Sequence, residues 1–351
     1  MRVLVVGGTG LIGSHAAMEL MRRGHEVTVM ARKEPDRTLA PKELGFVPGD
    51  YVEKTYDPEV FRQFDGLVFA TGLDWRLQPK IDAWDFFRKS NVEAIADLFR
   101  VAAEKGVKRA VLVSSFYHAV RPALRVQAYI RSRFESEDAA IEAGGNTMNV
   151  SCVAPSWVMG PIPWSDVDGF GKIISKMVYG NKPLLFLPGG TNWISATTLG
   201  SIIAEALERA EHGTKYLAGG VNRTWQEVIQ RFVELSGQKR KVRTVPRTLL
   251  FMLSLLVIAY RKIRGRNSGW RETSWVGTMS DKVYFEPTEA QKDLGYVDSD
   301  IDSAIAETHA FYRQRFDPHA AAVNPEETSS ASPETADKAM SKQNIGTANS
   351  A

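Results

Sequence analysis

Short apolar runs rich in β-branched residues alternate with longer amphipathic stretches through the first half of the chain. Strands are predicted at residues 2–6, 26–30, 44–47, 65–70, 109–113 and 148–153, and helices at 11–23, 90–105 and 129–143. Strands separated by helices are typical of a parallel sheet with crossover helices. The continuous apolar run at 65–70 suits a strand that is covered on both faces. The pattern therefore predicts an α/β fold with a doubly wound parallel sheet.

The pattern changes after Pro155, where Gly, Pro and Trp become frequent. We expect residues 1–155 to form the sheet domain and residues 156–316 to form a smaller, interleaved C-terminal lobe that binds the substrate. Strand-like segments near 184–187 and 215–218 are candidates to rejoin the first sheet, and further helices are predicted at 198–210, 225–236 and 301–312. Residues 317–351 hold no aromatic residue and almost nothing large and apolar, so a disordered tail is predicted there.

One segment, residues 248–260, is apolar around every face of a helix. It is shorter than the roughly 20 residues that a membrane span needs. Basic residues flank it on both sides: Arg240, Lys241, Arg243 and Arg247 before it, and Arg261, Lys262, Arg264 and Arg266 after it. An apolar helix with basic flanks suits the interface of an anionic membrane, so a peripheral membrane contact through residues 248–266 is expected. A buried helix and the wall of an apolar pocket are the alternatives.

Composition and charge narrow the class of protein. The net charge of +3 is too small to favour nucleic acid as a partner, and we predict no metal site. Cys152 is the only cysteine, so a disulfide framework is excluded and a buried, inert thiol is expected. The apolar start of the chain is too short for the core of a signal peptide. We therefore expect a cytoplasmic protein that can associate with a membrane. We also expect a homodimer.

The first predicted strand leads into Gly7-Gly-Thr-Gly-Leu-Ile-Gly13 and then into a helix. Gly7 permits a tight turn, Gly10 lets the backbone approach a phosphate, and Gly13 allows close packing of the helix on the strand. The free N–H groups at the start of the helix then face a pyrophosphate. This order of strand, glycine turn and helix predicts a Rossmann-type dinucleotide site, formed here by Gly7, Thr9, Gly10, Leu11, Ile12 and Gly13.

The end of the second strand indicates which dinucleotide is bound. An acid at this position usually binds the ribose 2′-hydroxyl of NAD, but the sequence here is Met30-Ala-Arg-Lys33. Arg32 can bind a 2′-phosphate with two hydrogen bonds, and Lys33 adds positive charge. The expected cofactor is therefore NADP in preference to NAD. If Arg32 instead stacks on the adenine, the choice stays open.

Further motifs add to the glycine turn, and together they make residues 1–315 resemble the extended short-chain dehydrogenase/reductases. This family includes NAD-dependent epimerases and dehydratases, dihydroflavonol reductases and 3β-hydroxysteroid dehydrogenases. The matching segments are Gly49-Asp50, Ala70-Thr71-Gly72, Asn91-Val92, Gly106 to Ser115, Pro155 to Pro161 and Glu289 to Tyr296. The resemblance implies that the cofactor also contacts Asp50, Ala70, Thr71, Gly72, Ser114, Tyr129, Arg133, Pro155 and Val158.

The resemblance also implies the catalytic group, a serine with a Tyr-x-x-x-Lys pair on one face of a helix. The best match is Ser115 with Tyr129-Ile-Arg-Ser-Arg133, where arginine stands in place of lysine. In this family the tyrosine exchanges a proton with the substrate oxygen, while the cation favours the ionised tyrosine. Arg133 supplies the charge but is bulkier than lysine and cannot relay a proton. A second match, Tyr117-His-Ala-Val-Arg121, follows the strand closely, and His118 is expected in a loop.

The segment of residues 156–285 bears on the substrate. It contains Trp157, Trp164, Trp193, Trp225, Trp270 and Trp275 besides the apolar helix. If several of them line the cleft, the ligand is large and apolar. We therefore predict an NAD(P)-dependent oxidoreductase that interconverts a carbonyl and an alcohol on a steroid, isoprenoid or alkyl substrate. A nucleotide-sugar epimerase or dehydratase, and a non-catalytic NAD(P)-binding sensor or assembly factor, are the alternatives.

Overall fold

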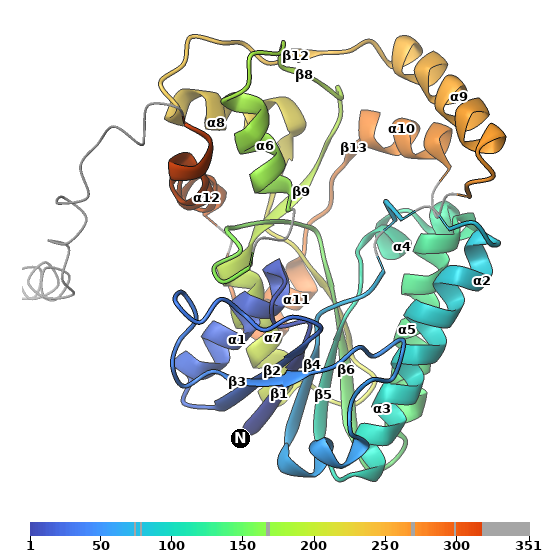
Figure 1. Ribbon diagram of the computed structural model, residues 1–351, viewed down its shortest axis with the longest axis vertical. Helices are drawn as coiled ribbons and strands as arrows, with labels where there is room; N and C mark the ends of the chain where they lie inside the picture. Colours follow the sequence, from blue (N-terminus) through green and yellow to red (C-terminus); the bar gives the residue numbers. More distant parts are fainter. Residues whose placement is uncertain (74, 78, 166–168, 268–270, 298–299, 318–351) are drawn as a thin grey trace, which may run out of the picture.

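Seven parallel strands form the central sheet within the residues that the computed structural model describes, which are 1–73, 75–77, 79–165, 169–267, 271–297 and 300–317 (Figure 1). They run in the order β3-β2-β1-β4-β5-β6-β10. Their bounds are Arg2–Val6 (β1), Glu26–Ala31 (β2), Gly45–Pro48 (β3), Gly66–Phe69 (β4), Arg109–Val113 (β5), Asn149–Pro155 (β6) and Lys215–Ala218 (β10). The strand order reverses direction between β1 and β4, where doubly wound sheets bind their ligands. The predicted α/β fold is confirmed.

Helices cover both faces of this sheet (Figure 1). On one face, α1 (Leu11–Arg22) packs against α7 (Ala196–Arg209), with α11 (Thr288–Leu294) beside α7. On the other face, α3 (Ala94–Glu104) packs against α5 (Ala128–Gly144), and a 3₁₀ turn, η1 (Pro58–Gln63), lies next to α3. Apolar residues on both faces of the strands are therefore buried, as their continuous apolar runs predict.

The helix predicted at 90–105 begins earlier than its apolar pattern suggests. It is preceded by α2 (Ala83–Arg88) and a π-helical turn, η2 (Lys89–Glu93). The carboxylate of Asp82 accepts hydrogen bonds from the backbone N–H groups of Trp84 and Asp85, so Asp82 caps the first turn. This cap explains the earlier start.

The second lobe is built on a smaller sheet in the order β11-β9-β13, with β7 also paired to β9. The strands are Trp157–Met159 (β7), Gly190–Ser195 (β9), Val221–Thr224 (β11) and Lys282–Val283 (β13). The helices α6 (Phe170–Val178), α8 (Trp225–Leu235) and α12 (Ile301–Phe316) pack on one another. Trp193 and Trp225 are fully buried with their ring centres 5.3 Å apart, so they form the core of this lobe.

The two strand-like segments considered for the first sheet behave differently. Residues 215–218 form β10, which pairs with β6 as predicted. The prediction that residues 184–187 rejoin this sheet is wrong: β8 (Leu185–Phe186) pairs with β12 (Arg243–Thr244) in a separate two-stranded ribbon. The reason is that β10 already takes the position beside β6, which leaves the short β8 to pair within the second lobe.

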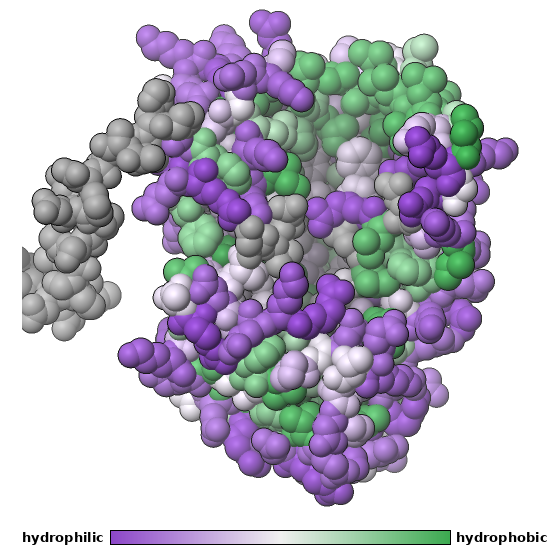
Figure 2. Space-filling view, in the orientation of Figure 1, coloured by the Kyte–Doolittle hydropathy of each residue, from purple (hydrophilic) through white to green (hydrophobic). Residues whose placement is uncertain are grey.

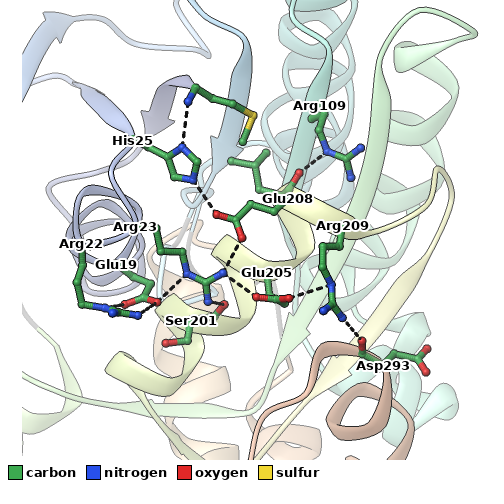
Figure 3. Close-up of polar contacts among 12 residues, drawn as sticks. Glu19, Arg22, Arg23, His25, Arg109, Ser201, Glu205, Glu208, Arg209 and Asp293 are labelled. Carbon is green, nitrogen blue, oxygen red and sulfur yellow. Dashed lines mark hydrogen bonds and ion pairs between the residues drawn. The ribbon is translucent and has the colours of Figure 1, made fainter.

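Charged side chains join α1 to α7 close to the N-terminus (Figure 3). Arg23 pairs with three carboxylates: Nε lies 2.8 Å from Glu19, and Nη1 lies 2.6 Å from both Glu205 and Glu208. His25 contacts Glu208 from the other side at 2.7 Å. Helix α7 belongs to the second half of the chain, so this network fastens that half to the first βα unit.

The remaining helices, α9 (Arg247–Ile263) and α10 (Glu272–Ser280), lie at the end of the molecule opposite the N-terminus (Figure 1). Helix α9 contains the predicted apolar segment 248–260. No helix in the described ranges is long and apolar enough to cross a membrane. Apart from Asp317, the tail predicted at 317–351 lies outside the described residues, as does Trp270.

Candidate active site

The glycine turn after β1 brings the start of α1 very close to the strand. Gly7 has a φ of +82°, a backbone conformation that favours glycine. A Cβ atom on Gly13 would stand 2.3 Å from the carbonyl oxygen of Gly7, so no side chain fits there. No described side chain caps Gly10, which immediately precedes α1. The first N–H groups of the helix are therefore available to an anion, which fits a pyrophosphate.

A loop from the second lobe supports this turn. The indole N–H of Trp164 donates to the carbonyl oxygen of Gly8 at 3.1 Å, and the hydroxyl of Ser165 donates to that of Thr9 at 2.6 Å. Trp164 is 1% exposed. Its role is to support the cofactor loop, which corrects the idea that it lines a substrate cleft.

Arg32 and Asp50 lie side by side at the ends of β2 and β3. The Nε atom of Arg32 is 4.0 Å from a carboxylate oxygen of Asp50, and the Arg32 side chain is 80% exposed. Asp50 is held in place by accepting hydrogen bonds from the backbone N–H groups of Val52 and Glu53. The Arg32 guanidinium is therefore exposed just beyond the end of β2, with Lys33 exposed next to it.

A cavity of about 430 Å³ extends from the glycine turn across the ends of β4, β5 and β6. Twelve of the predicted site residues line it: Gly10, Leu11, Ile12, Ala70, Thr71, Gly72, Ser114, Ser115, Tyr129, Arg133, Pro155 and Val158. The other six do not: Gly7, Thr9 and Gly13 form the turn beneath it, and Arg32, Lys33 and Asp50 lie beyond its end. The structure therefore gathers residues from five separate motifs in one cleft.

Arg133 is buried in the wall of this cleft. Its Nη2 group donates to the carbonyl oxygens of Val113 and Ser114, and its Nη1 group lies 3.5 Å from that of Thr71. The guanidinium thus joins the ends of β4 and β5. In the part of the chain that the structure describes, its Nε–H group is buried and has no hydrogen-bond partner. A donor of this kind in the cleft wall fits a ligand that brings hydroxyl or carbonyl oxygens.

Asn91 connects the segment after β4 to helix α5. It is fully buried, and its side chain bonds both the N–H and the C=O group of Leu73. Its amide also donates to the hydroxyl of Ser132, next to Arg133 on α5. A side chain from the π-helical turn thus fixes the cleft wall at Gly72 and Leu73 relative to the helix that carries Tyr129.

The two tyrosine candidates have different surroundings. Tyr117 begins the short helix α4 (Tyr117–Val120), and the 3₁₀ turn η3 (Pro122–Val126) lies between α4 and the helix that carries Tyr129. The Tyr117 hydroxyl accepts a hydrogen bond from the Trp157 indole at 2.8 Å, and burial raises the pKa of Tyr117 well above its ordinary value. Both tyrosines line the cleft, but Tyr129 is only half-buried and packs edge-on against Phe87. Ionisation of Tyr117 is therefore strongly disfavoured, and Tyr129 stays the candidate for proton transfer that the sequence predicts.

Sequence reasoning missed a buried pair behind Ser114, formed by His118 and Glu137. His118 lies on α4 rather than in a loop, and its Nε2 atom is 2.8 Å from the carboxylate of Glu137 and 3.4 Å from the Ser114 hydroxyl. Burial opposes the charged form of Glu137, but hydrogen bonds from His118 and Ser114 hold its pKa below its ordinary value. Glu137 follows Tyr129 by eight residues on α5, and this helical spacing was the one available signal.

The aromatic lining also differs from the prediction. Trp157 lines the cleft together with Phe116 and Trp75, which the sequence pattern did not single out. Trp275 lies outside this cleft and stacks on Trp75, with ring centres 5.4 Å apart. The described residues include no group of three or more His, Cys, Asp or Glu side chains that could hold a metal ion.

Comparisons with known proteins agree with the fold. The model of the NAD dependent epimerase/dehydratase family matches residues 3–219. Sterol demethylase protein B of Methylococcus capsulatus is 24% identical over 90% of this chain and 99% of its own length. UDP-glucose 4-epimerase of Klebsiella pneumoniae is 28% identical over 33% of this chain and 89% of its own length. The NAD⁺ complex of Bordetella bronchiseptica WbmH superposes with a TM-score of 0.65 at 17% identity, covering 89% of this chain and 98% of WbmH.

Proposed function

The chain belongs to the NAD-dependent epimerase/dehydratase family, and from this premise we propose that it is an oxidoreductase that interconverts a carbonyl and an alcohol on a hydrophobic substrate. The observation that carries the proposal is the cleft itself. Ser115, Tyr129 and Arg133 line it next to the aromatic side chains of Trp75 and Trp157. Proton-transfer groups and an apolar wall thus meet in one cavity.

Each polar residue of the cleft has a distinct task. A bound nicotinamide cofactor supplies or accepts the hydride. The Tyr129 hydroxyl donates a proton to the carbonyl oxygen during reduction and takes it back during oxidation. The Ser115 hydroxyl donates a hydrogen bond that orients the same oxygen. The positive charge of Arg133 favours the ionised form of Tyr129. The Nε–H group of Arg133 would donate a hydrogen bond to the ribose of a bound cofactor.

The lining of the cleft supports an apolar substrate. Its described cationic residues are Arg76 and Arg133, and Arg133 is bonded to backbone carbonyls. Lys172, Lys176 and Lys182, the lysines that could have bound a nucleotide-sugar diphosphate, do not line it. The full-length likeness to sterol demethylase protein B supports a steroid, isoprenoid or alkyl substrate.

For the cofactor, we propose NADP in preference to NAD. Arg32 supports this choice because its side chain is exposed at the end of β2, where a 2′-phosphate would lie. Asp50 tempers this preference, since it already neutralises part of the Arg32 charge. The nucleotide retained after gentle purification tests the proposal: bound NADP supports it and bound NAD contradicts it.

The reaction is tested by following cofactor oxidation with a panel of lipophilic ketones. We expect wild-type turnover, and a loss of at least about 100-fold in Tyr129→Phe. Tyr117→Phe is the matched control, because it removes a hydroxyl only 12 residues away and leaves the proposed proton donor intact. Unchanged turnover in Tyr129→Phe, or a greater loss in Tyr117→Phe, would overturn the assignment.

A nucleotide-sugar epimerase is the second candidate, and the match of UDP-glucose 4-epimerase to about a third of the chain favours it. An epimerase would retain NAD through its cycle and interconvert UDP-sugars without net cofactor oxidation. A chain that binds cofactor but turns over neither ketones nor UDP-sugars would be a sensor or assembly factor.

A further inference from the structure

Helix α9 carries large apolar side chains on the surface of the molecule. Met252, Leu256 and Ile263 are 64%, 67% and 83% exposed, and within α9 only Ser254 is buried. Figure 2 shows hydrophobic side chains gathered over α9 at one corner of the molecule. A contiguous apolar surface of this kind is unusual on a protein that meets only water.

The charges within the segment that holds this helix are all positive, and two of them are paired from outside it: Arg247 with Asp281 and Arg261 with Glu272. Residues 235–271 contain ten lysines and arginines and no aspartate or glutamate. Lys241 and Arg243 are exposed before the helix, and Lys262 and Arg264 are exposed at its end. An apolar surface with basic residues at both ends matches the two components of an anionic bilayer, its acyl chains and its headgroups.

A second cavity lies behind α9. Its volume is about 270 Å³, and its walls include Leu253 and Val257 of α9 and Trp275 of α10. Trp75 and Arg76 line both this cavity and the cleft that holds Tyr129. The apolar helix, the second cavity and the active site are therefore neighbours in that order.

We infer that α9 lies flat in the surface of an anionic phospholipid membrane and that the cavity behind it admits a lipid-dissolved substrate to the cleft. The second half of this inference rests on the proposed function. The 17 residues of α9 are about 25 Å long, which suits a helix in the interface rather than across the bilayer. A second copy of the chain fits this surface less well, because both copies would bring the same positive charge.

Docking is tested by sedimentation of the full chain with vesicles. Wild type is expected to bind vesicles of phosphatidylcholine mixed with phosphatidylglycerol, and to bind pure phosphatidylcholine more weakly. Met252→Gln/Leu256→Gln should weaken binding about tenfold or more. Leu39→Gln is the matched control, since Leu39 is 59% exposed in the first half of the chain.

The charges are tested in the same assay. Lys262→Gln/Arg264→Gln should weaken binding to the anionic vesicles about tenfold, and Lys42→Gln/Lys108→Gln, exposed lysines far from α9 in the sequence, should not. Docking is overturned if wild type does not bind anionic vesicles or if the α9 variants bind like wild type. It is also overturned if wild type binds no vesicle and instead forms a dimer that the Leu256→Gln substitution dissociates.

The path to the cleft has its own variant. Val276→Phe adds bulk at the second cavity from α10, away from the exposed face of α9, so it should bind vesicles like wild type and reduce a short water-soluble ketone at the same rate. Its kcat/KM for a long-chain ketone in vesicles should fall about tenfold. Equal rates for the long-chain ketone overturn the path. If wild type reduces no ketone, the proposed function and the path both fail, while docking is decided by the vesicle results.

Discussion

Replacing Arg133 by methionine removes the side chain that joins the ends of β4 and β5. Two of its hydrogen bonds reach the carbonyl oxygens of Val113 and Ser114 from a buried, charged donor. Leaving a buried acceptor unpaired costs about 1–3 kcal/mol. We therefore expect Arg133→Met to lower the free energy of unfolding by about 2–5 kcal/mol, measured by urea unfolding followed through tryptophan fluorescence.

Arg133→Lys separates this structural role from the role of the charge. Lysine keeps the cation but loses the planar fork, so about half of the stability loss should remain. In alcohol oxidation, the pH at which the rate rises should be wild-type-like in Arg133→Lys. In Arg133→Met it should move upward by at least about one unit, because a nearby cation favours the ionised form of an acid.

The control is Arg131→Met on the same helix. Arg131 is half-exposed and pairs with Glu135 at 2.7 Å, so its loss should cost less than about 1 kcal/mol. The reasoning is refuted if Arg133→Met lowers stability but leaves the pH profile where it was. Arg133 would then be a structural residue only. Faster turnover in Arg133→Lys than in wild type would indicate a site weakened by its arginine.

Three further changes test other parts of the molecule. Gly13→Ala should weaken dinucleotide binding by at least about tenfold in a fluorescence titration, because its Cβ would stand 2.3 Å from the Gly7 carbonyl oxygen; unchanged affinity contradicts this. Arg32→Gln should weaken NADP binding by about tenfold and leave NAD binding unchanged, and equal losses would show that Arg32 does not bind the 2′-phosphate. Arg23→Met should lower the free energy of unfolding by about 2–4 kcal/mol at pH 7, since it leaves three carboxylates close together. Hydrogen bonds from Arg22 and then Arg23 lower the pKa of Glu19 to about 2. The stabilisation that ionised Glu19 contributes to the folded state is therefore present above about pH 4.5 and lost as the pH falls toward 2. An effect of Arg23→Met on the free energy of unfolding that does not shrink over this pH range contradicts the role given to the Arg23–Glu19 pair.

The first half of the fold could be predicted because each of its features has a local signal. A strand covered on both faces is a continuous apolar run, and the glycine turn needs residues without a Cβ at fixed positions. The second lobe has weaker signals. β8 is two residues long, and its pairing with β12 depends on which sheet edge β10 has already taken, a tertiary fact that no local pattern contains.

The candidate site could be predicted residue by residue but not as an arrangement. The spacing of Tyr129 and Arg133 predicts one helix face, yet it does not show that the guanidinium faces the backbone carbonyls of Val113 and Ser114. The buried pair of His118 and Glu137 has partners 19 residues apart on two helices, so only the packing of α4 on α5 reveals it. Contacts between elements decide these positions.

A boundary at residue 155 is useful for describing the sequence but does not separate two folding units. β10 completes the first sheet from beyond that boundary, and α7 covers the face of the sheet next to α1. Trp164 and Ser165 hold the carbonyl groups of Gly8 and Thr9 in the cofactor turn. The geometry of the dinucleotide site therefore depends on the second lobe, because part of the support for the glycine turn comes from that lobe.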